Sequence, residues 1–334
     1  MRIGTGIGGW LDGVGDAAER AEAAGYDYVN CGELAHDSIL TMCVAATRTQ
    51  RLELQTSVTI AFPRAPMVLA MEAWDLQKLS RGRFVLGLGS QVKGHNERRF
   101  SVPWSAPAPR MKEYIETIRA IWKSFQEGAP ADFTGRHYRY QLMTPNFNPG
   151  PIELPRPRIF MAVVGPAMAR VAGEVADGVF PVWMSPENSD VIVPHIEKGM
   201  AAAEGDKSLA DFDIAPFVSC IVGDDLEKCR MPVKGMLSIY IGGMGARGKN
   251  FYNDYAKRLG YEEDAAKIQD LFLDGKKAEA MAAVPDELID EVALVGPRER
   301  IAERVDVWKA SPVNSMLLGA GQPEALRLLA ELVL

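Results

Sequence analysis

The sequence contains few cysteines and few histidines, and neither residue type is spaced for a metal site or a disulfide framework. Its four cysteines, Cys31, Cys43, Cys220 and Cys229, form no Cys-x-x-Cys pair, and its four histidines are scattered along the chain. Structural zinc sites and disulfide-stapled folds need ligands or cysteines at much closer spacing. The sequence therefore predicts neither a metal centre nor disulfide bonds.

Long hydrophobic runs and long basic runs are also lacking. No apolar stretch reaches the length of a membrane span, and the opening MRIGTGIGG has neither the basic nor the apolar region of a signal peptide. We therefore expect a cytoplasmic protein without a membrane partner. The formal net charge of −7 disfavours nucleic acid as a partner and favours a small molecule.

What the sequence has instead is a regular alternation of strand and helix patterns. Its 334 residues, 47% of them hydrophobic, can bury one barrel-sized core or two smaller ones. The clearest strand starts at Arg51, is apolar and rich in β-branched residues, and ends at prolines that open a helix over 67–80. This strand-helix unit recurs along the chain.

Eight strands are expected, each followed by a helix. They lie at 2–8, 26–33, after Arg51, and at 84–89, 158–164, 178–183, 212–222 and 315–319. Asp16 is expected to cap the first helix, with Glu19 completing a capping box. Two excursions interrupt the alternation, the proline-rich segment 126–157 and the mostly helical segment 224–290. The pattern favours an α/β fold of the (β/α)8 TIM-barrel type, a single domain over 1–334, over an open doubly wound sheet.

A glycine pattern at the N-terminus supports a competing interpretation. Gly4, Gly6 and Gly9 fit Gly-x-Gly-x-x-Gly, and Glu33 follows where a dinucleotide-binding fold would place its ribose-binding acid. Only residues 1–3 precede the glycines, which is too little for the strand that the motif requires. The alternation of Gly4, Gly6 and Gly8 is expected instead to leave room for a flat ligand against the backbone.

Four runs of residues carry a family resemblance. They are SVTIAFPRAP (57–66), SRGRFVLGLGSQ (80–91), NERRF (96–100) with Arg110, Glu113 and Trp122 after it, and LVGPRERIAERV (294–305). Together, and in this order, they resemble the bacterial luciferase-like family, and within it the coenzyme F420-dependent oxidoreductases, the group that includes methylenetetrahydromethanopterin reductase. The resemblance implies a 5-deazaflavin or flavin ring held at the carboxyl ends of the barrel strands.

The resemblance also implies cofactor-binding residues. It places a non-prolyl cis peptide bond between Ser57 and Val58, in a bulge behind the ring. The residues expected near the ring and its side chain all stand at strand ends: Gly8, Ser57, Val58, Thr59, Ser90 and Gln91. A strand-to-helix turn is expected to seat the phosphate, because free N–H groups and the helix dipole favour an anion there. That turn consists of Val164, Gly165, Pro166, Ala167 and Met168.

The candidates for catalysis, His36 and Glu33, follow the second strand. Luciferase-like enzymes commonly have an acidic residue and a histidine adjacent here, whereas two residues separate Glu33 from His36 in this chain, and Asp37 directly follows the histidine. Which carboxylate partners His36 stays open. Because histidine exchanges a proton near neutral pH, we expect His36 to carry the proton that accompanies hydride transfer.

These residues predict an F420-dependent oxidoreductase that transfers hydride between the deazaflavin and an unidentified organic substrate. The first alternative is an FMN-dependent flavin monooxygenase of the same superfamily, and the second is a cofactor-binding or carrier protein without turnover. The apolar bulk of the helix over 67–80, together with the family's frequent pairing through this side, predicts a homodimer.

Overall fold

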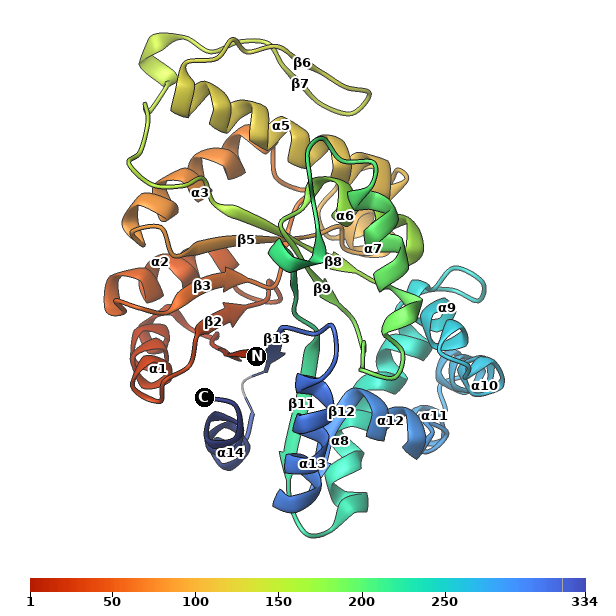
Figure 1. Ribbon diagram of the computed structural model, residues 1–334. Coiled ribbons are helices and arrows are strands. Elements are labelled where there is room, and N and C mark those ends of the chain that lie inside the picture. Colours follow the sequence, from red (N-terminus) through yellow and green to blue (C-terminus); the bar gives the residue numbers. More distant parts are fainter. Residues whose placement is uncertain (320) are drawn as a thin grey trace.

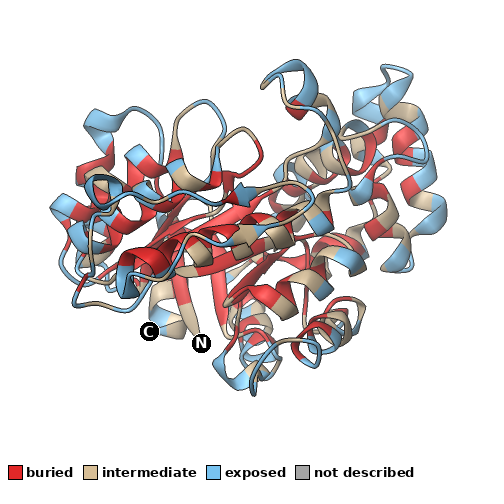
Figure 2. Cartoon of the chain, turned by 90° about the horizontal axis from the view of Figure 1, so that it is seen from above, coloured by how far each residue is buried: buried red, intermediate tan, exposed pale blue. Residues whose placement is uncertain are grey.

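The structure is a computed structural model that describes residues 1–319 and 321–334. Parallel strands form one curled sheet, and helices surround it (Figure 1). Seen from above, the strands form the buried centre of the molecule, while exposed residues concentrate on the outer helices and loops (Figure 2).

The strands close into a barrel. In order of pairing they are β1 (Arg2–Gly6), β2 (Tyr28–Cys31), β3 (Glu53–Thr56), β5 (Phe84–Gly89), β8 (Arg158–Val163), β9 (Gly178–Pro181), the bent segment β10 (Asp213–Ile214) with β11 (Phe217–Val222), and β13 (Ser315–Leu318). β10 pairs with β9, β11 pairs with β13, and β13 pairs with β1, so the sheet meets itself. The predicted (β/α)8 barrel is confirmed.

Two short strands add to this barrel. β4 (Thr59–Ile60) resumes the third strand after a bulge and pairs with β5, and β12 (Ala293–Gly296) pairs with the outer part of β11. β12 is not expected from the sequence, because four residues between two helical patterns give too short a periodic signal.

Helices surround the barrel, and the helix predicted over 67–80 is confirmed to within one residue at each end. They are α1 (Leu11–Ala23), α2 (Ser38–Arg48), α3 (Pro66–Leu79), α5 (Pro107–Glu127), α6 (Pro166–Val175), α7 (Val193–Met200), α13 (Arg298–Lys309) and α14 (Pro323–Val333), with the short α4 (Lys93–Arg98) before α5. The prediction that Asp16 caps the first helix is wrong. α1 begins at Leu11, and Asp16 and Glu19 instead bind Arg48 of α2 across the helix pair.

The barrel interior is filled by side chains below its carboxyl side. The buried residues that fill it are Tyr28, Val85, Phe160, Phe180, Ala215 and Leu317. A Cβ atom on Gly4 would stand 2.0 Å from the Tyr28 ring. This glycine therefore makes room for the tyrosine, and the expectation that it leaves room for a flat ligand is wrong. Gly4 and Gly6 also lie within β1, whereas a dinucleotide-binding turn follows its strand.

The first excursion packs on the outside of the barrel. It holds the antiparallel hairpin of β6 (Phe133–Thr134) and β7 (Arg139–Tyr140) and a 3₁₀ turn at Pro145–Phe147. The Trp74 side chain of α3 donates a hydrogen bond to the Gly150 carbonyl at 3.2 Å. The segment lies alongside α3 and α5 (Figure 1), and none of its described residues lines either of the two clefts considered below.

The second excursion packs on the carboxyl side of the barrel. It contains α8 (Leu226–Ser238), a π-helical turn at Ile239–Gly243, α9 (Phe251–Arg258), α10 (Glu262–Leu273), α11 (Lys277–Ala282) and α12 (Asp286–Val292). The buried Trp183, just after β9, has its ring centroid within 5.7 to 6.3 Å of the rings of Tyr240, Tyr252 and Tyr255. These aromatic contacts fasten the excursion to the strand ends.

Within residues 1–319 and 321–334, no helix has both the length and the apolar character needed to cross a membrane. Across the same ranges, no three side chains of the His, Cys, Asp or Glu type gather into a possible metal site, and all four cysteines are free.

Candidate active site

A cleft of about 630 Å³ opens at the carboxyl ends of the strands. The loops after β2, β3, β5 and β8 contribute to it, together with the first residues of α5 and α6 and one side of α9. Its lining consists of Gly32, Glu33, Leu34, Ser57, Val58, Ile60, Gly89, Ser90, Gln91, Val92, Ala106, Pro107, Ala108, Pro109, Ala162, Val164, Gly165, Pro166, Ala167, Met168, Phe251, Tyr252, Asp254 and Arg258. The volume lies within the range of small-molecule and cofactor sites.

One wall of the cleft is the bulge between β3 and β4. The peptide bond between Ser57 and Val58 is cis, as the family resemblance implies. Ser57 Oγ and Asn30 Oδ1 are hydrogen-bonded at 3.0 Å, and Asn30 in turn donates to the Leu318 carbonyl. A Cβ atom on Gly89 would stand 2.4 Å from Val58 Cγ2, so only glycine lets the Val58 side chain pack against β5. The bulge is thus held from three strands.

Glu33 fixes the same bulge through an ion pair that is largely shielded from water. Its carboxylate accepts hydrogen bonds from the Ile60 backbone N–H at 2.7 Å and from both terminal nitrogens of Arg64, at 2.6 and 2.9 Å. Arg64 also binds Asp37 at 2.6 Å. The sequence left open whether Glu33 or Asp37 is the partner of His36. In the structure both carboxylates bind Arg64 instead. This geometry favours a positioning role for Glu33 over the catalytic role expected from the sequence.

His36 lies at the barrel mouth, outside the lining of the cleft. Its ring stands edge-on to Trp10, with centroids 4.8 Å apart, and Trp10 is 78% exposed. His36 belongs to the same loop as Leu34, which does line the cleft. The structure therefore leaves His36 beside the cleft and not in its lining.

The opposite wall of the cleft can receive an anion. The first turn of α6 presents backbone N–H groups without partners inside the helix, at Ala167 and Met168, and Pro166 at its first position has none to offer. Arg258, at the end of α9, donates to the Val164 carbonyl at 3.1 Å. Among the described residues, no carboxylate lies within 4 Å of this guanidinium. The helix terminus and the arginine together present donors suited to a phosphate group, and we call this group of residues, 164–168 with Arg258, the phosphate seat.

The structure brings together ten of the candidate residues and leaves three apart. Those that line the cleft are Glu33, Ser57, Val58, Ser90, Gln91, Val164, Gly165, Pro166, Ala167 and Met168. Those that do not are Gly8, His36 and Thr59. Thr59 is buried, with its hydroxyl bonded to that of Ser38 at 2.8 Å, and Gly8 stands in the loop after β1.

Sequence reasoning missed the lining from the helical excursion and from α5. Phe251, Tyr252, Asp254 and Arg258 reach the cleft from α9, and Ala106–Pro109 reach it from the start of α5. The run FYNDYAKR carries no motif, and Arg258 meets Val164 across 94 residues, so no local pattern indicates the contact. The prolines of the α5 start were the one available signal, since proline favours the first helical turn.

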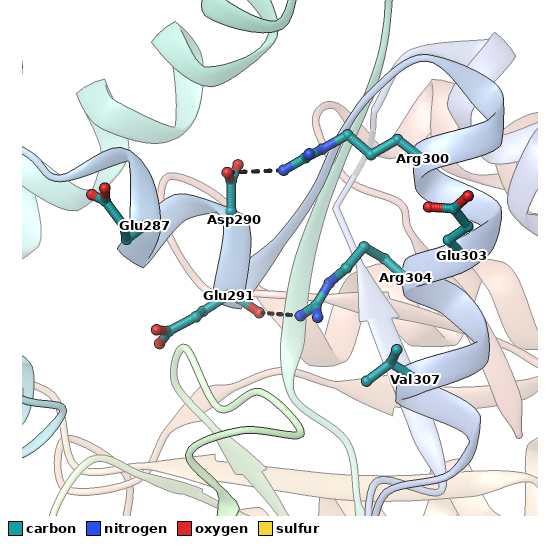
Figure 3. A pocket seen from close by; sticks show the side chains of 7 residues that line it. All are labelled: Glu287, Asp290, Glu291, Arg300, Glu303, Arg304 and Val307. Carbon is teal, nitrogen blue, oxygen red and sulfur yellow. Dashed lines mark hydrogen bonds and ion pairs between the residues drawn. The ribbon is translucent and has the colours of Figure 1, made fainter.

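A smaller depression of about 510 Å³ between α12 and α13 is an ion-pair surface on the outer side of the barrel (Figure 3). Arg300 binds Asp290 at 2.8 Å, and Arg304 donates to the Glu291 carbonyl at 3.2 Å. Asp290 is also bound by Arg230. Both arginines are thus paired within the protein, Arg304 also with Glu187, and the depression shares no lining residue with the cleft, so we interpret it as structural.

A (β/α)8 barrel with a cleft of cofactor size at its carboxyl face, walled by a bulge on one side and by free helix N–H groups and an arginine on the other, has the fold and the site position of a barrel enzyme. The chain belongs to the luciferase-like monooxygenase family, whose profile matches residues 4–315. It is accordingly a luciferase-like oxidoreductase.

Three known proteins show how this chain relates to others of the family. A putative coenzyme F420-dependent oxidoreductase of Mycobacterium tuberculosis is 31% identical, covering 100% of this chain and 99% of that protein. The structure of the coenzyme F420-dependent tetrahydromethanopterin reductase from Methanopyrus kandleri superposes with a TM-score of 0.79 at 20% identity, covering 99% of this chain and 98% of that one. The oxygenating constituent of 3,6-diketocamphane monooxygenase from Pseudomonas putida, in complex with FMN, superposes with a TM-score of 0.68 at 15% identity, covering 100% and 98%.

Proposed function

We propose that the protein is a coenzyme F420-dependent oxidoreductase that transfers hydride between the deazaflavin and an organic substrate. The observation that carries this proposal is the cleft, which joins a wall for a flat ring, at Ser57 and Val58, to a phosphate seat at Gly165 and Arg258. The mycobacterial relative, which matches over the full length and is named F420-dependent, supports the choice of cofactor.

The residues present fit such a cofactor. A Cβ atom on Gly165 would meet only Arg258 Nη2, at 3.7 Å, so the glycine leaves the seat open toward the cleft. The adjoining N–H groups and the guanidinium are donors suited to phosphate oxygens. A bound deazaflavin supplies hydride chemistry at its ring, and the protein's part is to hold that ring against the bulge and to manage the accompanying proton.

We assign the proton to His36. Glu33 already accepts three hydrogen bonds, two of them from Arg64, so both of its oxygens are engaged by the protein. Across residues 1–319 and 321–334, the His36 ring nitrogens have no hydrogen-bond partner, so they are available to a substrate at the mouth. Ser90 and Gln91 line the same cleft as the bulge and the phosphate seat, and we expect them to contact the cofactor's side chain.

FMN is the second candidate for the cleft, because the phosphate seat suits its phosphate equally well and one structural neighbour contains FMN. A flavin there would make the protein a monooxygenase, since reduced flavin reacts with oxygen whereas a deazaflavin lacks the usual oxygen chemistry. The two functions are therefore separated by which cofactor binds.

The test is a fluorescence titration of the purified protein with F420 and with FMN. We expect tighter binding of F420, and we expect Gly165→Val to weaken it at least tenfold because the added side chain fills the phosphate seat. Gly13→Val is the matched control, since nothing stands within 4 Å of a Cβ at Gly13 among the described residues. Micromolar FMN binding with no binding of F420 would overturn the proposal.

The expected homodimer also belongs to the proposal. On α2 and α3, four large apolar side chains are about half exposed: Leu40, Val68, Met71 and Leu79. Covering such side chains with the same face of a second copy would remove their apolar surface from water.

A further inference from the structure

A second and larger cleft, of about 1130 Å³, adjoins the first. It lies between α4, which follows β5, and the loop that leads from the π-helical turn to α9. Val92, Phe251 and Asp254 line both clefts, so the two spaces meet at these residues. A molecule in the second cleft therefore reaches the proposed cofactor site directly.

The second cleft is basic in an acidic protein. Four permanent cations line it, against two carboxylates, although the chain has a formal net charge of −7. The cations are Lys93, Arg98, Arg99 and Lys249. A concave site lined by one sign of charge concentrates ligands of the opposite sign.

Most of these cations are not neutralised by the protein. Lys93 has only a loose contact with Glu97, at 3.8 Å, and Arg99 donates to the Leu34 carbonyl at 2.6 Å. For Arg98 and Lys249, no carboxylate of the described residues lies within 4 Å. Arg98 lies over Gly94, where a Cβ would stand 2.9 Å from its Nη2, so glycine at this position makes room for the guanidinium.

The walls of the second cleft are apolar and its loop is held in place. Trp104, Met244, Phe251 and Leu273 line it, and Phe251 and Leu273 are 50% and 41% exposed. The glycine-rich loop ends at the buried Asn250, which donates to the Tyr240 and Ile241 carbonyls at 3.0 and 2.9 Å and so ties the loop to the π-helical turn. Loop and helix thus present charge and apolar surface together in a fixed arrangement.

From this combination we propose that the second cleft binds an organic anion: a molecule with a carboxylate or phosphate group held by Arg98 and Lys249 and an apolar body placed against Trp104 and Phe251. Guanidinium and ammonium groups bind these anions through charge-assisted hydrogen bonds. The position of this anion beside a cofactor rests on the proposed function, and the chemistry of the second cleft adds the class of the neighbouring ligand. Two sources can supply that anion: a separate anionic substrate, or acidic groups of the cofactor beyond its phosphate.

The test uses 8-anilinonaphthalene-1-sulfonate, which carries one anionic group on an aromatic body, as a fluorescent probe for the intact protein. We expect the double variant Arg98→Gln/Lys249→Gln to bind the probe about five- to tenfold more weakly, and we expect the wild-type affinity to fall with salt more steeply than that of the variant. The charge-matched control is Arg20→Gln/Lys123→Gln, which removes two exposed cations far from the cleft and should bind like the wild type.

Equal binding of the probe by the wild type and the Arg98/Lys249 variant, with equal thermal stability, would overturn the inference. Displacement of the probe by F420 but not by FMN assigns the anion site to the acidic end of the cofactor. Retention of the probe in the F420-loaded protein assigns it to a separate anionic substrate. If F420 fails to bind while probe binding still depends on Arg98 and Lys249, the anion site stands and the proposed cofactor is wrong.

Discussion

Replacing Glu33 with glutamine tests whether its carboxylate holds the bulge or takes part in the reaction. Glu33 is 11% exposed and Arg64 is 17% exposed, so their ion pair is largely shielded from water. Glutamine keeps one acceptor for the Ile60 N–H but turns an amide toward Arg64. The perturbation therefore removes one charge from a buried network and changes little of its shape.

The loss can be sized from the remaining contacts. Removing one partner of a buried pair can cost about 3 to 5 kcal/mol, but Asp37 still neutralises Arg64 at 2.6 Å, so the unpaired-charge penalty is mostly avoided. What remains is a hydrogen bond to a charged group, worth about 1.5 to 3 kcal/mol. For a chain of 334 residues we expect the melting temperature to fall by about 2 to 4 °C.

The assay pairs thermal unfolding with cofactor titration and single-turnover kinetics. Glu97→Gln is the matched control, because Glu97 is 41% exposed and its contact with Lys93 spans 3.8 Å; its melting temperature should stay within about 1 °C of the wild type. A Glu33→Gln variant that melts like the wild type yet turns over at least 100-fold more slowly would refute the positioning role and return Glu33 to the reacting groups.

Three further predictions follow from other parts of the molecule. His36→Ala should slow single turnover about 100-fold or more while leaving F420 affinity unchanged, and Gly165→Val should do the reverse; normal turnover of His36→Ala would make the histidine a bystander. Burial alone would raise the pKa of Asp177, but the hydrogen bonds and positive charges of Arg156 and Arg119 have the larger effect and lower that pKa to about 2. The contribution of Asp177, about 2 kcal/mol, is therefore complete above about pH 4 and is lost as the pH falls toward 2, so urea unfolding of Asp177→Asn should depend less on pH in this window; an unchanged slope would contradict the pairing. Light scattering should give a homodimer at micromolar concentration that Met71→Asp converts to a monomer, and a monomeric wild type would dismiss the α2–α3 face as an interface.

The sequence predicts those parts of the fold that depend on local pattern. β5 begins and ends where expected, because Phe84–Gly89 is an unbroken apolar run between turn residues. The position of the Ser57–Val58 bulge came from the family resemblance, since no residue propensity favours a cis bond at a serine and a valine. The start of α1 was misplaced because Asp16 and Glu19 imitate a capping box, while their true partner, Arg48, lies on another helix.

The local sequence pattern does not predict which charged side chains pair with one another. Glu33 was expected to serve catalysis because the family resemblance implies an acid and a histidine after the second strand, yet the tertiary fold gives it Arg64, 31 residues away. Likewise, Arg258 belongs to the phosphate seat only because the helical excursion returns over α6. A carboxylate or guanidinium acquires its role from the charges that folding brings within about 4 Å, and those charges come from distant elements here.

The barrel strands and the helical excursion contribute different parts of the two clefts. The barrel strands supply the bulge and one side of the phosphate seat, and under the proposed function any flavin-like ring with a phosphate tail could use both. The helical excursion supplies Arg258 to the first cleft and Lys249 to the second, along with Phe251 where the two clefts meet. Because aromatic contacts around Trp183 fasten that excursion to the strand ends, changes in its loop can alter which ligand binds without disturbing the barrel core. Selection between ligands of similar ring structure is therefore expected to reside in 239–258, where charge and apolar surface meet the cofactor site.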